Sequence, residues 1–168
     1  TTGNYPGRAR NIDEVRTDLE KVQSLLAGTY RVNLHEIYGE FGDKFVDRNE
    51  VEVSHFAGWM QWAKEHNLKL DFNSTSFSHP KSGDLTLSNP DKGIREFWIE
   101  HTKRCRRIAD AMGKAQGDPC IMNIWVHDGS KDYTVERYRY RQLLKESLDE
   151  ILAEDLPDMK PCLEAKLF

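Results

Sequence analysis

Cys120-Ile-Met-Asn-Ile-Trp-Val126 is the stretch that decides the fold, because it is a short apolar run that ends in an aromatic residue, and three other runs follow the same pattern. Each of the first three runs in the chain is followed by a long amphipathic segment, the pattern of a helix with one buried face. Strands that alternate with helices predict parallel pairing with right-handed crossovers, and therefore an α/β fold. The other three predicted strands are Arg31–Ile37, Leu68–Asn73 and Cys162–Phe168.

Helix signals lie between these strands. Asn11 is a plausible cap for a helix that ends before Gly28, and Ser54 is a plausible cap for the next one. A long apolar stripe from Ile94 predicts a helix that ends at Gly113 or Gly117. The fourth predicted helix is capped by Thr134 and buries a stripe of Val135, Tyr138, Leu144, Leu148, Ile151 and Leu152. Residues 74–91 contain proline, glycine and several serines and predict a long loop.

The length and the position of the last strand bound the architecture. A chain of 168 residues suits one domain or part of one, and is too short for an eightfold βα barrel of about 250 residues. The last predicted strand has no helix to cover it, which leaves an edge that a complete domain would usually protect. We therefore expect missing C-terminal partners, and the absence of an initiator methionine suggests a segment cut from something longer.

Charge and cysteine content limit the classes of partner. The 24 basic residues are outnumbered by 28 acidic ones, which gives a formal charge of −4 and makes nucleic acid an unexpected partner. No apolar run approaches the roughly 20 residues that span a bilayer, so no membrane is expected. Three cysteines without C-x-x-C spacing favour a reduced, cytoplasmic compartment.

Polar residues on the strands are the first functional candidates, because ligands bind outside the carboxyl ends of parallel strands. His35 can exchange a proton near neutral pH, although a core histidine satisfied by a backbone carbonyl is the more ordinary interpretation. Asp71 and Asn73 are two residues apart and share a strand face, so they could bind a polar substrate or hydrogen-bond the following loop. His79 and His127 lie in loops and are expected to be structural or solvated.

Three further candidates lie on the last two strands. Trp125 could form a flat wall against the apolar side of a sugar, or could pack under a helix. Glu164 and Lys166 project from one face of the last strand, where burying them unpaired would be costly. They either pair with each other, or the carboxylate meets a metal and the ammonium an oxyanion or hydroxyl. The chain has no Walker loop, G-x-S-x-G or H-E-x-x-H motif.

Seven blocks in order along the chain resemble bacterial L-rhamnose isomerase. Because the blocks agree in order and spacing over the whole length, the resemblance is far more specific than a lone motif. The blocks are Thr2–Asn11, Asn33–Tyr38, Leu70–Asn73, Phe77–Pro80, Met122–Trp125, Asp128–Asp132 and Glu164–Phe168.

The resemblance implies a (β/α)8 TIM barrel in a cytoplasmic homotetramer that interconverts L-rhamnose and L-rhamnulose with a divalent metal, typically Mn²⁺. Residues 1–168 would form a single incomplete barrel domain with strands two to five, without the first strand and the C-terminal half.

Four residues receive roles from this resemblance. His35 would assist ring opening, and Trp125 would be the aromatic wall. Glu164 would be a metal ligand, and Lys166 the cation near the carbonyl end of the sugar. The remaining metal ligands have no counterpart in this chain, so we expect the chain alone to be inactive.

Two other hypotheses come from different classes of protein. The first is a non-catalytic α/β module whose tip residues only bind a sugar, and dependence of activity on metal would separate it from an isomerase. The second is a folding fragment of structural or assembly value only, whose exposed apolar surface a partner must cover.

Overall fold

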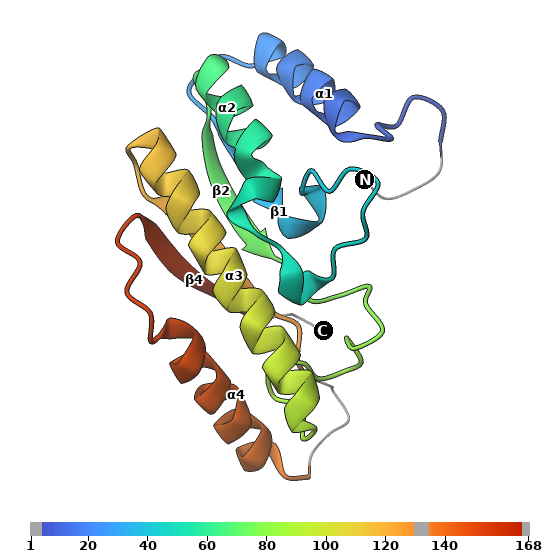
Figure 1. The fold of residues 1–168 in the computed structure, drawn as a ribbon, viewed down its shortest axis with the longest axis vertical. Coiled ribbons are helices and arrows are strands. Elements are labelled where there is room, and N and C mark those ends of the chain that lie inside the picture. Colours follow the sequence, from blue (N-terminus) through green and yellow to red (C-terminus); the bar gives the residue numbers. More distant parts are fainter. Residues whose placement is uncertain (1–4, 130–134, 166–168) are drawn as a thin grey trace.

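The computed structural model describes residues 5–129 and 135–165 and contains a parallel sheet of four strands in the order β1-β2-β3-β4 (Figure 1). Each strand therefore pairs with the next strand along the chain. The sheet and its intervening helices confirm the predicted α/β class. The strands are β1 (Arg31–His35), β2 (Lys69–Ser74), β3 (Cys120–Val126) and β4 (Met159–Ala165).

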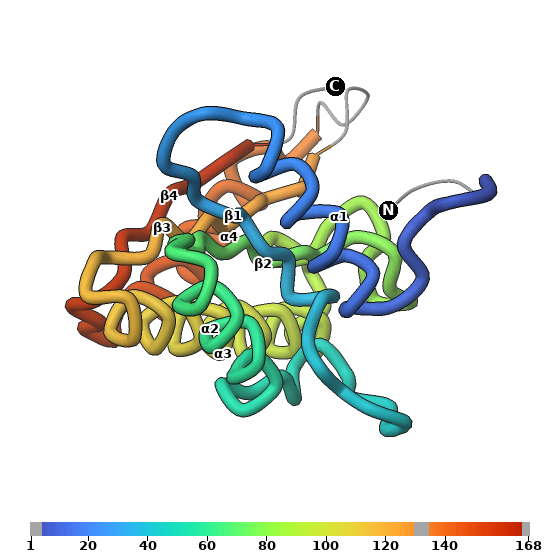
Figure 2. The backbone as a smooth tube through the Cα atoms, turned by 90° about the horizontal axis from the view of Figure 1, so that it is seen from above, coloured from blue at the N-terminus to red at the C-terminus, as the bar shows by residue number. Residues whose placement is uncertain are grey.

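Helices precede and connect the strands. The four α-helices are α1 (Ile12–Leu25), α2 (Ala57–Glu65), α3 (Lys92–Gln116) and α4 (Arg137–Leu152), and three short 3-10 turns are η1 (Glu36–Tyr38), η2 (Arg48–Glu50) and η3 (Val53–Phe56). Figure 2 shows α2 and α3 on the same side of the strands. Helix α1 packs on α2, where the Trp62 indole donates a hydrogen bond of 2.8 Å to Glu20. Helix α4 packs on α3 (Figure 1) through the ion pair of Lys103 and Glu150.

The side chains that alternate along each strand separate a covered face from an open one. Leu34, Phe72 and Met122 point toward the helices and are at most 3% exposed. Their neighbours in sequence point the other way, because successive strand residues face opposite sides of a sheet. On β4 only Met159 is buried. The main buried residues of α3 that meet the covered face are Trp98, Cys105, Ile108, Ala109 and Met112.

Several predicted element boundaries are confirmed. Asn11 caps α1 by accepting a hydrogen bond from the Glu14 amide, and Gly117 ends α3 in the left-handed conformation with φ of 63°. Strand β3 has the predicted bounds. Residues 75–91 form the predicted loop between β2 and α3, with no helix or strand of their own.

Other boundaries were wrong. The first strand ends at His35 rather than Ile37, because the buried Glu36 begins a 3-10 turn and accepts a hydrogen bond from the Thr75 amide. Ser54 does not cap α2 but lies inside η3, which precedes that helix. The last strand begins at Met159, three residues before its predicted start. Pro161 lies inside this strand, which is an edge of the described sheet.

The start of the fourth helix also differs from the prediction. Helix α4 begins at Arg137, and Val135 and Tyr138 are 73% and 81% exposed, so neither belongs to the core. Their apolar character extended the predicted stripe beyond the packed part of the helix. The predicted cap, Thr134, lies outside the described residues.

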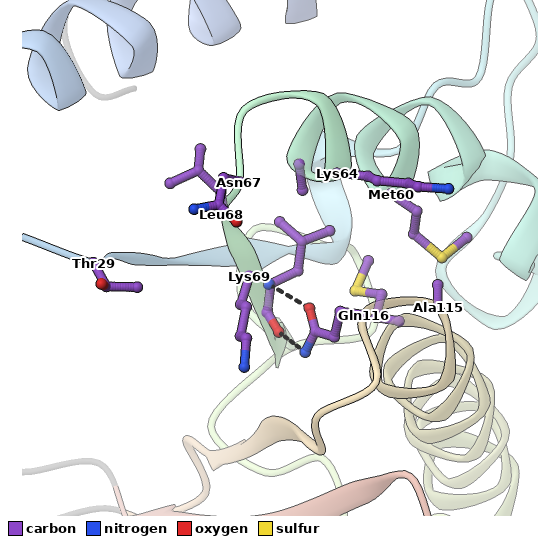
Figure 3. A pocket seen from close by; sticks show the side chains of 11 residues that line it. Thr29, Met60, Lys64, Asn67, Leu68, Lys69, Ala115 and Gln116 are labelled. Carbon is purple, nitrogen blue, oxygen red and sulfur yellow. Dashed lines mark hydrogen bonds between the residues drawn. The ribbon is translucent and has the colours of Figure 1, made fainter.

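Gln116, the last residue of α3, completes the hydrogen bonding of β2 near its start. Its Oε1 accepts a bond of 2.7 Å from the Leu70 amide, and its Nε2 donates one of 3.1 Å to the Leu70 carbonyl (Figure 3). Strand β3 pairs with β2 only from Phe72 onward, so the Gln116 amide takes the place of a neighbouring strand. The pocket beside it is also lined by Met60 and Lys64 and lies at the amino ends of the strands. In (β/α)8 barrels the residues at this end support stability, and active sites lie at the opposite end.

Candidate functional site

A row of four side chains crosses the open face of the sheet near the carboxyl ends of the strands. His35 on β1 is in register with Asn73 on β2, which is in register with Asn123 on β3. Asn123 is in register with Cys162 on β4. Each of the first three follows a buried residue that points to the helices, so the row faces away from them. The row is the candidate site, because ligands bind at this end of parallel sheets.

His35 is half-buried at the end of β1. Its Nδ1 lies 2.8 Å from the Thr75 hydroxyl, and its ring meets the edge of Tyr38 at a centroid distance of 6.4 Å. Burial lowers the pKa of His35 below its usual value, so the imidazole is neutral at pH 7. Within residues 5–129 and 135–165, no group bonds to Nε2. This nitrogen is therefore the one that can exchange a proton with a ligand.

The two asparagines next to His35 carry unsatisfied acceptors. The Oδ1 atoms of Asn73 and Asn123 are buried, and neither has a hydrogen-bond partner in the described part of the chain. Leaving a buried carbonyl unpaired is costly, so such atoms call for a donor. The hydroxyl groups of a sugar, or donors from further polypeptide on the open face, would satisfy them. The substrate contact of Asn73 stays a prediction, for which this side chain has an acceptor available.

Asp71 shares a strand face with Asn73, as its spacing predicted, but its surroundings are different. Its carboxylate accepts hydrogen bonds of 2.8 and 2.7 Å from the Arg31 guanidinium and one of 2.8 Å from the Ile121 amide. The hydrogen bond with Asp71 raises the pKa of Arg31 above its usual value. Arg31 also bonds Asp118, so these charges form a network at the amino ends of the strands. The predicted substrate contact of Asp71 gains no support from this placement.

Trp125 lies on the open face, two residues beyond Asn123, rather than under a helix. Its ring packs edge-to-face on Phe77 at a centroid distance of 5.0 Å. Phe77 comes from the long loop after β2 and is 37% exposed. The pair makes a partly exposed aromatic surface at the rim of the row. Phe77 belongs to one of the seven blocks of the resemblance, but no role was predicted for it, because a loop residue has no periodicity to reveal its orientation.

Glu164 extends the site on β4, where it is in register with Trp125. It is exposed, and its Oε2 accepts a hydrogen bond from the Asn123 side-chain amide. Lys166 lies outside the described residues. No group of three or more metal-binding side chains occurs in the parts of the chain that the structure describes. Asn123 had no predicted role, although its position two residues before Trp125 places it on the same face.

The loop after β2 is held over this end of the sheet by two residues that follow β3. The His127 ring is buried, with Nδ1 2.8 Å from the Ser76 hydroxyl and Nε2 3.0 Å from the Ser82 carbonyl. The Asp128 carboxylate accepts hydrogen bonds from the amide and hydroxyl groups of both Thr86 and Ser88. These contacts give His127 a structural role, one of the two readings left open for it. They also fix the loop that carries Phe77.

A family model described as L-rhamnose isomerase (RhaA) matches residues 1–168. The chain belongs to the L-rhamnose isomerase family. Curated relatives agree with this membership. The L-rhamnose isomerase of Bacteroides thetaiotaomicron is 70% identical over 99% of this chain, and that of Rhodopirellula baltica is 52% identical over 99%. The protein of the same name from Mannheimia succiniciproducens is 54% identical over 100% of the chain. The match covers 40% of the length of each relative.

Membership in the L-rhamnose isomerase family confirms the resemblance seen in the seven sequence blocks. Each of the seven blocks contains described residues, and these include His35, Asn73, Phe77 and Trp125 at one end of the sheet. In addition, no helix in residues 5–129 or 135–165 is long and apolar enough to cross a membrane.

Proposed function

We propose that this chain forms part of a metal-dependent aldose–ketose isomerase that interconverts L-rhamnose and L-rhamnulose. The observation that carries the proposal is the family match over the whole chain, and the row of polar side chains on the open face supports it. Because the chain spans 40% of its relatives, the activity belongs to a full-length isomerase that carries this sequence. The chain by itself is expected to be inactive.

The sheet fits a segment of a (β/α)8 barrel, with β1 to β4 as strands two to five of one incomplete domain. Sequential order supports this assignment, because a doubly wound sheet reverses its strand order at a switch point. The unequal faces support it too, since a barrel has helices outside and packed side chains inside. From the family we further propose a cytoplasmic homotetramer that acts on a monosaccharide, with no nucleic-acid or membrane partner.

The chemistry that we propose for the open face begins with ring opening. Ring opening breaks the bond between the anomeric carbon and the ring oxygen, removes the proton of the anomeric hydroxyl and adds a proton to the ring oxygen. The neutral His35 imidazole accepts the hydroxyl proton at Nε2, which no other described group uses, and returns it to the ring oxygen, so the sugar becomes the open-chain aldehyde and the imidazole is neutral again. Trp125 and Phe77 offer a flat surface to the apolar side of the sugar, and Asn73 offers an acceptor to a hydroxyl group. Lys166, which the structure does not describe, is proposed to lie near the carbonyl end of the sugar.

The proposed metal is Mn²⁺, which would stabilise the negative charge that develops on two neighbouring sugar oxygens. A carboxylate is a suitable ligand for this ion, and Glu164 offers one oxygen that Asn123 does not occupy. Glu164 is a single ligand, so the other ligands would come from beyond the described residues. The described residues therefore fit a shared metal site but cannot make a complete one.

Ring opening by His35 is tested with a full-length isomerase that carries this sequence. We expect His35→Ala to slow turnover of the closed-ring sugar by about a hundredfold, the range of general acid–base catalysis. A three-carbon hydroxyaldehyde, which cannot form a ring, should be affected much less. The measurement is steady-state kinetics on both substrates, with His66→Ala as the control because His66 lies at the end of α2, away from the row. Equal losses on both substrates would contradict the role.

Metal binding by Glu164 is tested by titration calorimetry with Mn²⁺ alone. We expect Glu164→Gln to weaken Mn²⁺ binding by about tenfold or more, because a neutral amide replaces a charged ligand. Glu150→Gln is the matched control, since Glu150 is a partly exposed carboxylate on α4 that pairs with Lys103. Identical titrations for the two variants would refute the ligand role. Isomerase activity that persists in a chelator would favour a protein that uses no metal.

A further inference from the structure

The buried group that fixes His35 belongs to none of the seven sequence blocks. Thr75, the residue that follows β2, is completely buried, and its hydroxyl lies 2.8 Å from His35 Nδ1. The other ring contact of His35, with the edge of Tyr38, is non-polar and distinguishes poorly between two orientations of the imidazole. The Thr75 hydroxyl therefore decides which ring nitrogen faces the candidate site.

Thr75 is itself held by groups that have no contact with the open face. Its amide donates a hydrogen bond of 2.7 Å to Glu36 Oε2, and Glu36 is completely buried. Its carbonyl accepts a bond of 3.4 Å from Arg48, which also forms an ion pair with Glu36. Both backbone groups of Thr75 are thus engaged, which leaves its hydroxyl for His35.

The support extends into the helical layer. The Arg48 carbonyl accepts a hydrogen bond of 2.8 Å from Nδ1 of His101, which is buried on α3. Burial lowers the pKa of His101 to about 4, so this histidine is neutral, and its Nδ1 donates because a carbonyl oxygen can only accept. A continuous chain of contacts therefore runs from α3 through Arg48, Glu36 and Thr75 to His35. Packing of this kind is what holds a reacting group in one orientation.

We infer that Thr75 is a positioning residue for His35, which it holds by Nδ1 so that Nε2 faces the sugar, while the ion pair of Glu36 and Arg48 holds Thr75. The inference rests on the ring-opening role proposed for His35. It adds a requirement to that role, because the orientation of the ring then depends on a hydroxyl group that never touches substrate. Thr75 is a positioning residue and not a catalytic one.

The variants that test this inference differ by single groups. Thr75→Val removes the hydroxyl and keeps the size and the backbone bonds to Glu36 and Arg48, whereas Thr75→Ser keeps the hydroxyl. In a full-length isomerase that carries this sequence, we expect Thr75→Val to lower kcat on the closed-ring sugar by about five- to tenfold, the usual contribution of one hydrogen bond. Thr75→Ser should restore most of the loss. In the His35→Ala background, Thr75→Val should have no further effect on kcat.

A loss of kcat from Thr75→Val that is equal in both backgrounds would overturn the inference, because it would mean that Thr75 supports only the fold. Failure of Thr75→Ser to restore kcat would do the same.

A second measurement is independent of activity. Solid-state ¹⁵N spectra of enzyme labelled in histidine should show one tautomer of His35 in the parent protein and a shifted or mixed signal in Thr75→Val. An unchanged His35 signal would overturn the positioning role. If the signal changes but His35→Ala leaves turnover unaffected, the positioning role stands and the proposed ring-opening function fails.

Discussion

Glu36→Ala is expected to lower the free energy of unfolding by about 3–5 kcal/mol, the usual cost of removing one partner from a buried ion pair. The Glu36 side chain is fully buried, and only 16% of the Arg48 side chain is exposed. Burial already lowers the pKa of Arg48, yet its guanidinium stays charged at pH 7 and would be left without its carboxylate. The Thr75 amide would also lose its acceptor. Chemical denaturation followed by tryptophan fluorescence measures the loss.

Two comparisons show whether burial is the cause. Glu96→Ala breaks the exposed pair of Glu96 with Lys92 on α3, and its cost should stay below about 0.5 kcal/mol. Glu36→Gln retains an acceptor for the Thr75 amide and should cost less than Glu36→Ala. A cost for Glu36→Ala no larger than that for Glu96→Ala would mean that the buried pair does not stabilise the fold.

The ion pair of Glu36 and Arg48 is a part of the candidate site that the sequence could not predict. Alternation of apolar and polar residues placed His35 on a strand and Trp125 on the face of Asn123, because a strand has a period of two. Glu36 follows His35 directly, and nothing local indicates that the strand ends there. Its partners, Arg48 and Thr75, are distant in the sequence, so the turn is fixed by tertiary contacts.

The ends of the strands show the same division between local and tertiary signals. Asp71 and Asn73 lie two residues apart on the same face of β2, so the sequence could not distinguish their roles. Arg31 on the neighbouring strand forms an ion pair with Asp71 and not with Asn73. The composition of the long loop after β2 predicted a loop but not its shape. That shape depends on His127 and Asp128, which follow β3 directly. Local patterns predicted the elements, whereas contacts between elements decide which polar groups remain available to a ligand.

Gly113→Ala is the second change with a large expected effect, about 3 kcal/mol or more of lost stability. A Cβ at this position of α3 would lie 1.7 Å from the Asp158 carbonyl oxygen and 2.9 Å from the Cys120 amide nitrogen. Both atoms are backbone, and they bond to each other at 3.0 Å where β3 and β4 begin. No side chain can move aside, so the helix or the two strands must shift. Overpacking of this kind outweighs the gain of up to about 1 kcal/mol from the better helix propensity of alanine.

Gly93→Ala in the same helix is the matched control, because its Cβ would meet only the Asp91 side chain, at 3.3 Å. It should change the free energy of unfolding by less than about 1 kcal/mol. The two variants differ only in what surrounds the added methyl group, and denaturant titration of both measures that difference directly. Strands β3 and β4 carry Trp125 and Glu164, so Gly113→Ala should also displace these residues relative to His35. A Gly113→Ala protein as stable as Gly93→Ala would mean that α3 does not hold the starts of the two strands at this distance.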